Sequence, residues 1–398
     1  MKLVLGLGIS GKASASFLVK QGEKVVVYDD DPKTFADVRG VEFHEKGNSF
    51  DWNACEQVVV SPGVPPTHPL YQGAVERGIE VVGEIELALR HLKHRPMVGI
   101  TGTNGKTTVT LLISHLLNAA GKKSRAVGNI GTPLIEEVEH ADQEAILSIE
   151  LSSFQLERVE TKALDGGVIL NVTPDHNDRY PQMADYAKAK GRLAHILKKE
   201  GLFLLNPAIK PLVPELFTGN HQLLPNENRE AENISAAISL VKLFGLTDSQ
   251  IEKGLATFKK PPHRIEFIRD LKGIFYYSDS KSTNLDSTIH ALLTVEKNIL
   301  LIAGGVDKGF SFAPWKEYFA NRVKALFLIG QAAHRIEQEL KNSVPIYQCG
   351  TLREALLLST TLGTSGDNIL LSPGCSSYDQ FKNYHDRGEQ FRQLVIDL

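Results

Sequence analysis

The stretch Val98-Gly-Ile-Thr-Gly-Thr-Asn-Gly-Lys-Thr-Thr108 follows a short apolar run and precedes a segment with helical apolar spacing over residues 109–117. The sequence therefore predicts a strand that enters the stretch and a helix that leaves it. Such a strand, glycine-rich turn and helix form a cradle for phosphate, because backbone N–H groups converge there and the helix N-terminus adds positive potential. We expect Lys106 to reach the β- and γ-phosphates of ATP and the Thr107 hydroxyl to bind magnesium.

The match to a phosphate-binding loop is not strict, because Ile100 stands six residues before Lys106, where the strict motif has glycine. A glycine-rich turn without a nucleotide is the alternative interpretation. The Gly-Lys-Thr-Thr run in this context favours the nucleotide site. The residues expected to contact ATP in this loop are Gly102, Thr103, Asn104, Gly105, Lys106, Thr107 and Thr108.

The composition of the 398-residue chain, with 42% hydrophobic and 23% charged residues, is ordinary for a globular enzyme of two or three domains. A formal net charge of −3 gives no reason to expect nucleic acid or an anionic membrane as a partner. No apolar run approaches the ~20 residues of a membrane helix, and the first residues carry no targeting signal. Because Cys55, Cys349 and Cys375 show no metal or disulfide spacing, we expect a protein of the reducing cytoplasm.

Residues 1–92 read as a first α/β domain with a Rossmann-like parallel sheet. The turn Gly6-Leu-Gly-Ile-Ser-Gly11 has the GxGxxG pattern, and Asp29 and Asp30 follow the next predicted strand about 20 residues later. NAD is one possible occupant, a sugar-nucleotide diphosphate is another, and glycines that serve only close packing are the third alternative. A third predicted strand ends in Ser61-Pro-Gly63, where the small residues allow a diphosphate to approach the backbone.

Residues 93–259 read as a central domain whose parallel sheet carries the phosphate loop. Glu150 ends a predicted buried strand beside that loop, which is where a further magnesium ligand is needed. Asp175, His176, Asp178 and Arg179 crowd one loop after the next predicted strand. Carboxyl ends of parallel strands are where α/β sheets place chemistry, so His176 is a candidate for metal or phosphate binding.

Residues 260–398 read as a third domain, a second Rossmann-like unit after a proline-rich linker that carries Arg264. Helices are expected at about 284–293, 334–342 and 352–360. Four polar residues follow predicted strands, as expected for a domain that binds a small charged substrate, and these are Asp279, Lys281, Lys308 and Ser372.

Six stretches together resemble one known family over all three domains. They are Gly-Thr-Asn-Gly-Lys-Thr-Thr (102–108), Glu-Leu-Ser-Ser-Phe-Gln-Leu-Glu (150–157), Asn-Val-Thr-Pro-Asp-His-Asn-Asp-Arg-Tyr (171–180), Pro-His-Arg (262–264), Asp-Ser-Lys-Ser-Thr-Asn (279–284) and Leu-Ser-Pro-Gly-Cys-Ser-Ser-Tyr-Asp-Gln-Phe (371–381). The family is that of the Mur ligases, which form amide bonds at the expense of ATP in peptidoglycan precursor synthesis. The first and fourth stretches are shared with the wider superfamily, which includes folylpolyglutamate synthases. The second and sixth, with Ser61-Pro-Gly63 and Gly83-Glu-Ile-Glu-Leu87, most resemble the members that add D-glutamate to UDP-N-acetylmuramoyl-L-alanine.

The resemblance implies that ATP first phosphorylates the L-alanine carboxylate and that the amine of D-glutamate then attacks the acyl phosphate. It implies two magnesium ions, one held by Thr107 and Glu150 and the other by His176. Family members carry a carbamylated lysine on the helix that matches residues 186–196, and Lys190 occupies that place as a possible N6-carboxylysine. A carbamate oxygen can bind a divalent cation, whereas an ammonium group is repelled by it.

The resemblance also implies which residues bind each substrate. The catalytic residues that it implies are Lys106, His176, Lys190 and Arg264. The UDP-sugar residues are Ser10, Asp29, Asp30, Ser61, Gly63 and Asn129. The ATP residues outside the loop are Asn233, Arg264, Asp279 and Lys281. The D-glutamate residues are Thr283, Lys308, Ser372 and Phe381. We expect a monomer.

One stretch departs from the family pattern. The adenine-side pattern His-Asn-x-x-Asn is replaced here by Arg229-Glu-Ala-Glu-Asn233, so Glu230 stands where an asparagine is usual. A carboxylate only accepts hydrogen bonds, whereas an amide also donates them, so adenine recognition is in question. The central domain is also short for the family between residues 201 and 232.

Three rival functions are compatible with parts of the sequence. An NAD-dependent oxidoreductase accounts for the first glycine-rich turn but not for the phosphate loop or the third domain. A nucleotide-dependent switch accounts for the phosphate loop and predicts turnover that is indifferent to amino acids. A folylpolyglutamate synthase would lack the N-terminal sugar-nucleotide domain.

Overall fold

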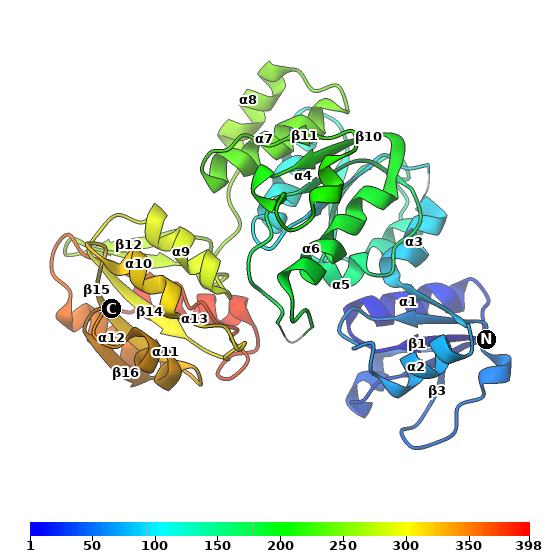
Figure 1. Ribbon diagram of the computed structural model, residues 1–398, viewed down its shortest axis with the longest axis horizontal. Helices are drawn as coiled ribbons and strands as arrows, with labels where there is room; N and C mark the ends of the chain where they lie inside the picture. Colours follow the sequence, from blue (N-terminus) through cyan, green and yellow to red (C-terminus); the bar gives the residue numbers. More distant parts are fainter. Residues whose placement is uncertain (93, 178) are drawn as a thin grey trace. The chain divides into compact units, whose positions relative to one another are not determined.

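The computed structural model of the chain describes residues 1–92, 94–177 and 179–398, with the backbone alone at residues 35–37 (Figure 1). The chain divides into two compact units. The first consists of Met1–Val172 and Gln182–Phe258, and the second consists of Thr173–Pro181 and Lys259–Leu398. Lys93 in the expected linker and Asp178 in the polar loop lie outside the described residues. Each unit is described by itself.

The N-terminal part of the first unit contains a five-stranded sheet of order β3-β2-β1-β4-β5, in which all pairs are parallel. Its strands are β1 (Lys2–Leu5), β2 (Val25–Tyr28), β3 (Glu42–Phe43), β4 (Gln57–Val60) and β5 (Glu80–Gly83), and its helices are α1 (Ile9–Lys20), α2 (Pro69–Glu76) and α3 (Glu84–Leu92). Leu5 pairs with both Tyr28 and Val60, so the loops that follow β1, β2 and β4 leave the sheet at one edge. The predicted parallel sheet is confirmed.

The central part of the first unit contains a six-stranded parallel sheet of order β11-β10-β9-β6-β8-β7. Its strands are β6 (Met97–Thr101), β7 (Ser124–Gly128), β8 (Ile146–Glu150), β9 (Leu164–Ile169), β10 (Leu197–Leu205) and β11 (Gln222–Leu223). Its helices are α4 (Lys106–Ala119), α5 (Ser153–Leu156), α6 (Met183–Gly191), α7 (Arg229–Lys242) and α8 (Asp248–Thr257). Apolar residues of α4, α7 and α8 pack together over β6 and β9 and bury the central strands.

Two details of this sheet differ from the sequence-based expectation. The helix expected over residues 186–196 is wrong in its second half, because α6 ends at Gly191 and a 3₁₀ turn follows over Arg192–Ile196. The tighter turn lets Leu193 and Ile196 be buried before the chain enters β10. Strands β10 and β11 were not expected, because charged and proline residues interrupt the apolar pattern there.

The second unit contains a six-stranded sheet of order β12-β13-β17-β14-β15-β16, in which β12 is antiparallel to β13 and the other pairs are parallel. Its strands are β12 (Glu266–Leu271), β13 (Ile274–Ser278), β14 (Ile299–Gly304), β15 (Val323–Ile329), β16 (Ile346–Gly350) and β17 (Asn368–Leu371). Its helices are α9 (Leu285–Thr294), α10 (Lys316–Phe319), α11 (Ala333–Leu340), α12 (Leu352–Leu362) and α13 (Tyr384–Ile396). The α/β class is confirmed, and this sheet is mixed rather than wholly parallel.

Helices cover both faces of this sheet, because successive buried residues of β14 pack against different helices. Leu301 and Ala303 pack with α9, α10 and α11, whereas Leu300 and Ile302 pack with α12 and α13. The three helices expected near residues 284–293, 334–342 and 352–360 are confirmed as α9, α11 and α12 within a few residues.

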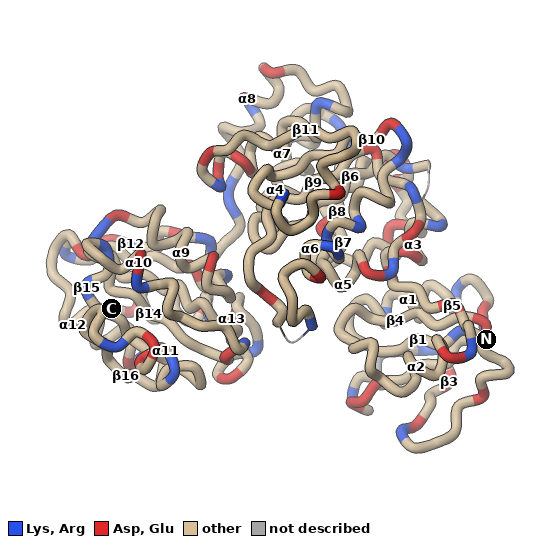
Figure 2. The backbone as a smooth tube through the Cα atoms, viewed as in Figure 1, with Lys and Arg blue, Asp and Glu red and all other residues tan. Residues whose placement is uncertain are grey.

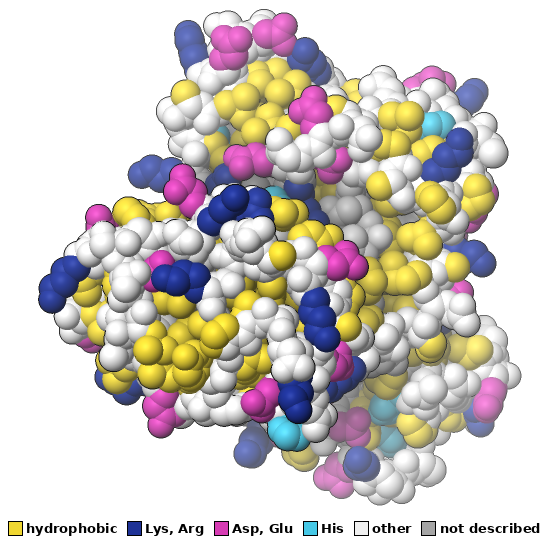
Figure 3. Space-filling view, turned by 60° about the vertical axis from the view of Figure 1, so that its left-hand side comes forward, with side chains coloured by type: hydrophobic (Ala, Val, Ile, Leu, Met, Phe, Trp, Pro, Cys, Tyr) yellow, Lys and Arg dark blue, Asp and Glu magenta, His cyan; other side chains and the backbone are white. Residues whose placement is uncertain are grey.

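Acidic and basic residues are interspersed along the chain, with no long block of either sign (Figure 2). On the face shown in Figure 3, dark-blue and magenta side chains lie scattered between apolar ones rather than forming one basic stripe. No helix within the described ranges combines the length and apolar character that a membrane crossing requires.

Candidate functional site

The loop between β6 and α4 needs glycine at two positions. Gly102 has a φ of 152° and Gly105 a φ of 87°, which L side chains rarely adopt. A Cβ atom on Gly102 would also lie 3.1 Å from Leu170 Cβ and 3.3 Å from Asn171 N. The predicted strand, turn and helix are therefore present, and α4 begins at Lys106.

Asn171, two residues beyond β9, holds this loop in place. Its Oδ1 accepts a hydrogen bond from Asn104 N–H at 2.8 Å, and its Nδ2 donates one to Asn104 O at 3.0 Å. Its own carbonyl accepts from Thr103 N–H at 2.9 Å. The sequence interpretation assigned no role to Asn171, although an amide just after a predicted strand beside the loop was a usable signal.

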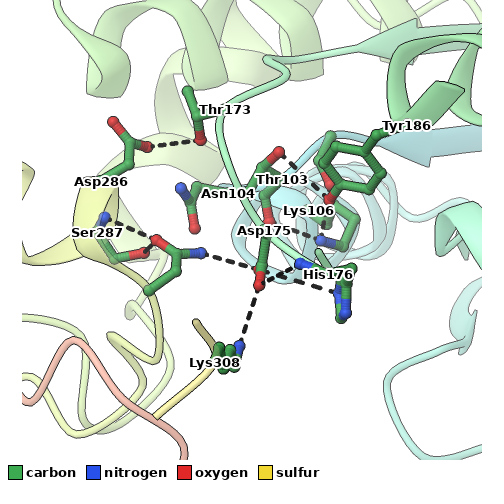
Figure 4. Close-up of polar contacts among 12 residues, drawn as sticks. Thr103, Asn104, Lys106, Thr173, Asp175, His176, Tyr186, Asp286, Ser287 and Lys308 are labelled. Atoms are coloured by element: carbon green, nitrogen blue, oxygen red, sulfur yellow. Dashed lines mark hydrogen bonds and ion pairs between the residues drawn. The ribbon is translucent and has the colours of Figure 1, made fainter. Parts of the chain in front are cut away.

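Two lysines converge on one carbonyl of the loop. Lys106 Nζ donates to Gly102 O at 2.8 Å and to Thr103 O at 2.8 Å, and Lys190 Nζ donates to Gly102 O at 2.9 Å. Lys190 is almost fully buried and lies 4.4 Å from the ring centre of Tyr186. The Tyr186 hydroxyl lies 3.4 Å from Thr103 Oγ1 (Figure 4). The site thus gathers positive charge where a phosphate group would lie.

Glu150, the last residue of β8, is buried beside the loop, since Ile100 of β6 pairs with it. Its Oε1 accepts a hydrogen bond from Asn129 Nδ2 at 2.9 Å, whereas Oε2 has no hydrogen-bond partner among the described residues. A buried carboxylate oxygen without a donor is costly unless a cation completes it. The pair Glu150 and Asn129 therefore fits a divalent metal site better than a purely structural one.

The donor set suits magnesium held largely by a nucleotide. Within the described ranges, no cluster of three or more His, Cys, Asp or Glu residues forms a self-sufficient metal site. Magnesium commonly binds one or two protein oxygens and completes its shell with phosphate oxygens and water. Glu150 and the half-buried Thr107 at the start of α4 match that requirement.

Asn233 on α7 lies against the phosphate loop. A Cβ atom on Gly105 would come 2.6 Å from Asn233 Oδ1, so the amide already touches the loop. Glu230 lies one turn earlier on α7 and is exposed. The structure therefore brings the predicted adenine-side residue Asn233 to the loop.

The segment Thr173–Pro181, which belongs to the second unit, carries Asp175 and His176 (Figure 4). Asp175 Oδ1 accepts from Lys308 Nζ at 3.0 Å, and Oδ2 accepts from Asn284 Nδ2 at 3.2 Å. Burial opposes ionisation of this carboxyl, but the charges of Lys308 and His176 outweigh it and hold the pKa of Asp175 below its ordinary value. His176 has a φ of 57° and a partly exposed side chain. Lys308, a predicted D-glutamate residue, therefore binds an internal carboxylate here.

Asp279 and Ser372 lie together inside the second unit and bond to each other. Asp279 Oδ2 accepts from Ser282 Oγ and from Ser372 Oγ, the latter at 2.8 Å, and Oδ1 accepts from Ile265 N–H at 3.2 Å. Burial raises the pKa of Asp279 to about 7, although these hydrogen bonds and the Arg264 charge oppose the rise. Ser372 is fully buried and also bonds to Thr288 Oγ1 at 3.2 Å.

The remaining predicted residues of the second unit are more accessible. Lys281 Nζ lies 3.9 Å from the ring centre of Tyr384. Arg264 and Thr283 are half-buried, and Phe381 is partly buried against the apolar layer formed by α12 and α13.

The first glycine-rich turn borders a cavity of about 430 Å³ at the edge of the N-terminal sheet. Five of the six residues predicted to bind the UDP-sugar line it, namely Ser10, Asp29, Asp30, Ser61 and Gly63. The sixth, Asn129, is not among the residues that line it and bonds to Glu150 instead. The cavity lies at the carboxyl ends of β1, β2 and β4. The strand order reverses between β1 and β4, and folds of this kind bind ligands at such a point.

Close packing between α1 and the turn after β1 explains one glycine of the pattern, Gly11. A Cβ atom on Gly11 would lie 1.9 Å from Gly6 O, so α1 can approach the turn only with glycine there. Ser61 Oγ donates to the same carbonyl at 2.7 Å. Tyr28 and His68 also line the cavity, and the sequence interpretation did not include them.

Three family models match successive parts of the chain. The Mur ligase MurD-like N-terminal domain matches residues 1–83, the Mur ligase middle domain residues 100–222, and the Mur ligase glutamate ligase domain residues 263–375.

Relatives match the chain over nearly its whole length. A UDP-N-acetylmuramoylalanine–D-glutamate ligase from Protochlamydia amoebophila is 39% identical over 99% of this chain and 97% of its own. A protein of the same name from Caldicellulosiruptor saccharolyticus is 37% identical over 100% of this chain and 98% of its own.

Solved structures share the fold at low identity. A UDP-N-acetylmuramate–alanine ligase from Thermotoga maritima is 17% identical, with a TM-score of 0.60 over 100% of this chain and 99% of that one. A MurF ligase from the same organism, in complex with ADP, is 15% identical, with a TM-score of 0.60 over 87% of this chain and 90% of that one. The chain belongs to the Mur ligase family, alongside the UDP-N-acetylmuramoylalanine–D-glutamate ligases that it matches from end to end.

Proposed function

We propose that this chain is an ATP-dependent ligase that joins D-glutamate to UDP-N-acetylmuramoyl-L-alanine in cytoplasmic peptidoglycan precursor synthesis. The observation that carries the proposal is the match to D-glutamate ligases at 36–39% identity across nearly the full chain. The phosphate loop and the cavity at the N-terminal sheet support it independently, because the reaction needs one site for ATP and another for a sugar nucleotide.

The chemistry follows from the low reactivity of a carboxylate. An oxygen of the L-alanine carboxylate attacks the γ-phosphorus of ATP, the bond to the β–γ bridging oxygen breaks, and ADP leaves. The amine of D-glutamate then attacks the carbonyl carbon of the acyl phosphate, loses a proton, and phosphate leaves as the amide forms. Both steps concentrate negative charge, so preorganised cations supply much of the rate enhancement.

Lys106 is proposed to move from the loop carbonyls that it binds in this structure to the β- and γ-phosphates of bound ATP. The N–H groups of the loop hold the phosphate oxygens, and Asn233 lies beside the adenine. Thr107 and Glu150 would hold one magnesium ion, and His176 would hold a second. Lys190 would be a further metal ligand if it is carbamylated to N6-carboxylysine. Magnesium supplies charge neutralisation at the phosphates when it is bound.

The remaining residues are assigned to the three substrates as the family resemblance implies. Ser10, Asp29, Asp30, Ser61, Gly63 and Asn129 are proposed to bind the UDP-sugar, Arg264, Asp279 and Lys281 to complete the ATP site, and Thr283, Lys308, Ser372 and Phe381 to bind D-glutamate. Residues 1–92, 93–259 and 260–398 are proposed as the three domains of a monomer.

The test is ATP-dependent phosphate release with UDP-N-acetylmuramoyl-L-alanine, measured with each candidate amino acid in turn and with none. Release that requires the sugar nucleotide and D-glutamate together is the expected result. Phosphate release with another amino acid would indicate a Mur ligase of different amino-acid specificity. Phosphate release that depends on neither the sugar nucleotide nor the amino acid would contradict the ligase proposal.

The role of Lys190 has a separate test. Lys190→Ala is expected to abolish activity, and short carboxylates are expected to restore part of it by replacing the carbamate. Full activity of Lys190→Ala in the absence of added carboxylate would contradict carbamylation as a requirement.

A further inference from the structure

The loop that joins β14 to the 3₁₀ turn Ala313–Trp315 carries Lys308, the cation proposed to bind D-glutamate. Lys308 Nζ donates a hydrogen bond to Asp175 Oδ1 at 3.0 Å. An ammonium group has three N–H donors, so this bond leaves donors for a substrate carboxylate. Because a lysine side chain is long and flexible, the position of its charge depends on how firmly the backbone beside it is held. The contacts of this loop therefore bear on substrate binding.

Arg335 of α11 holds the loop on both sides of Lys308. Its Nη1 donates to Asp307 Oδ2 at 2.5 Å, and its Nη2 donates to Phe310 O at 3.1 Å. The other oxygen of Asp307, Oδ1, accepts from Gly309 N–H at 2.7 Å and closes a tight turn around Lys308. A guanidinium group is planar and presents its donors in a fixed fork, so its two bonds to one loop fix both the position and the orientation of that loop.

Glu339, one turn later on α11, attaches the rest of the loop. Its Oε1 accepts from Arg335 Nε at 2.9 Å. Its Oε2 accepts from Ser311 Oγ at 2.7 Å and from the N–H groups of Phe312 and Ala313, at 2.6 and 3.2 Å. Arg335 and Glu339 together form the α11 clamp, which bonds to the loop before and after its lysine.

The α11 clamp contributes little to the stability of the fold. The side chains of Arg335 and Asp307 are 36% and 30% exposed, and ion pairs between such side chains stabilise a protein only slightly because water screens them. Phe312 and Trp315, which are almost fully buried in the apolar layer beneath the loop, anchor its end independently of the clamp. A group that the fold does not need, but that holds the residues on both sides of a substrate-binding lysine, suits a role in substrate binding.

We propose that Arg335 and Glu339 are positioning residues for D-glutamate, because they hold the loop that aims Lys308 at a substrate carboxylate. The inference rests on the proposed function, which assigns D-glutamate to Lys308. Each clamp residue acts through the loop rather than by contact with the substrate. Loss of the clamp spreads the positions of the ammonium group and weakens binding of D-glutamate, whereas ATP binding is affected little, because the residues assigned to ATP lie outside this loop.

Steady-state kinetics of the full chain, with D-glutamate and ATP varied in turn, test the proposal. Arg335→Met removes the forked donor, so the KM for D-glutamate is expected to rise roughly 10-fold and the KM for ATP to change less than about 2-fold. Arg335→Lys can still donate to Asp307 and is expected to recover part of the loss. Glu339→Ala removes the acceptor of the loop N–H groups and is expected to raise the KM for D-glutamate as well.

Arg353→Met is the matched control, because Arg353 is an exposed arginine on α12 of the same unit whose side chain bonds to no residue in the described part of the chain. Its KM values are expected to equal those of the unmodified chain. Urea unfolding separates positioning from a merely structural role, which would lower the unfolding midpoint of Arg335→Met and leave the KM of the folded enzyme unchanged.

An unchanged KM for D-glutamate in both Arg335→Met and Glu339→Ala would overturn the proposal. Equal rises in the KM for D-glutamate and for ATP would also overturn it, because they would indicate a general disturbance of the site. If the unmodified chain does not depend on D-glutamate at all, the proposed function is contradicted instead.

Discussion

The two glycine-rich turns of the first unit, Gly6–Gly11 and Gly102–Gly105, look alike in sequence but form hydrogen bonds to side chains of opposite charge. The turn after β1 receives a carboxylate, because Asp29 accepts the N–H of Leu7. The turn after β6 receives ammonium groups, because Lys106 and Lys190 donate to the Gly102 carbonyl. Each turn follows a strand and opens a helix, so the backbone plan is shared.

The difference shows that the ligand chemistry of such a turn depends on the side chains that reach it from elsewhere. With Lys106 on its carbonyls, the second turn brings a cation to the N-terminus of a helix, which suits a triphosphate. With a carboxylate on an N–H and a second acid in the cavity wall, the first turn suits donors such as hydroxyl or imide groups. A glycine pattern alone does not distinguish the two.

The largest expected effect comes from removing a positive charge at the second turn. Lys106→Met is expected to lower the rate of phosphate release by about 10²–10³-fold, because it removes a cation aimed at the developing phosphate charge. UDP binding, measured by calorimetry, is expected to remain unchanged, since the first turn does not use this lysine. Lys122→Met, at an exposed position near the end of α4, is the control and should keep full activity. An equal loss in both variants would contradict a specific role for Lys106.

The packing of the first turn is tested by adding one carbon atom. Gly11→Ala would place Cβ 1.9 Å from Gly6 O, so the free energy of unfolding is expected to fall by about 2–3 kcal/mol. Gly8→Ala is the matched control, because no atom lies within 4 Å of its added Cβ and its φ of −66° is ordinary. Its stability is expected to change by less than about 1 kcal/mol. The urea midpoints of the two variants measure the difference, and equal midpoints would refute the packing argument.

A dependence on magnesium is expected at the second turn and not at the first. Glu150→Gln keeps an oxygen that accepts the hydrogen bond from Asn129. It replaces the other, buried oxygen with an amide NH₂ group and removes the negative charge that attracts a cation. The magnesium concentration for half-maximal activity is expected to rise at least about 10-fold. Glu144→Gln, at an exposed position before β8, is expected to behave like the unmodified chain. If magnesium dependence is the same in all three proteins, Glu150 is not a metal ligand.

The smallest expected effect concerns pH at the first turn. Because burial lowers the pKa of His68, the imidazole is neutral above its ordinary pKa of about 6.5 and gains a proton only at lower pH. The folded state binds fewer protons than the unfolded state there, so the contribution of His68 to stability is present above that value and is lost as the pH falls. Protonation also removes the acceptor that caps α2.

UDP affinity is accordingly expected to fall about 2- to 5-fold more in the unmodified chain than in His68→Asn between pH 7 and 5. Calorimetry at both pH values measures this, and the variant corrects for protonation of the nucleotide itself. Identical pH profiles in the two proteins would exclude His68 as the titrating group.

Local patterns were sufficient for much of the fold and for the positions of both turns. Apolar runs predicted β1, β6, β8 and β14, and helical spacing predicted α4 and α9, because period and burial are encoded within a few residues. Strands β10, β11 and β16 and the antiparallel β12 were not predicted, since short or partly exposed strands carry weak alternation and are stabilised by their neighbours. The 3₁₀ turn after α6 was missed for the same reason, because it serves the burial of Leu193 and Ile196.

The sequence by itself determined the class of the protein, the two glycine-rich turns and the residue types that are predicted to bind phosphate and metal. Tertiary structure alone decided which of these residues meet. Asn171 braces a loop 67 positions earlier, and Asp175 pairs with Lys308 133 positions later. It also decided that Asp29 accepts hydrogen bonds from two backbone N–H groups, whereas Asp30 accepts from the side chains of Tyr28 and Lys46. Adjacent residues of one type cannot be told apart by local pattern, because strand order and side-chain direction, not sequence spacing, set their hydrogen-bond partners.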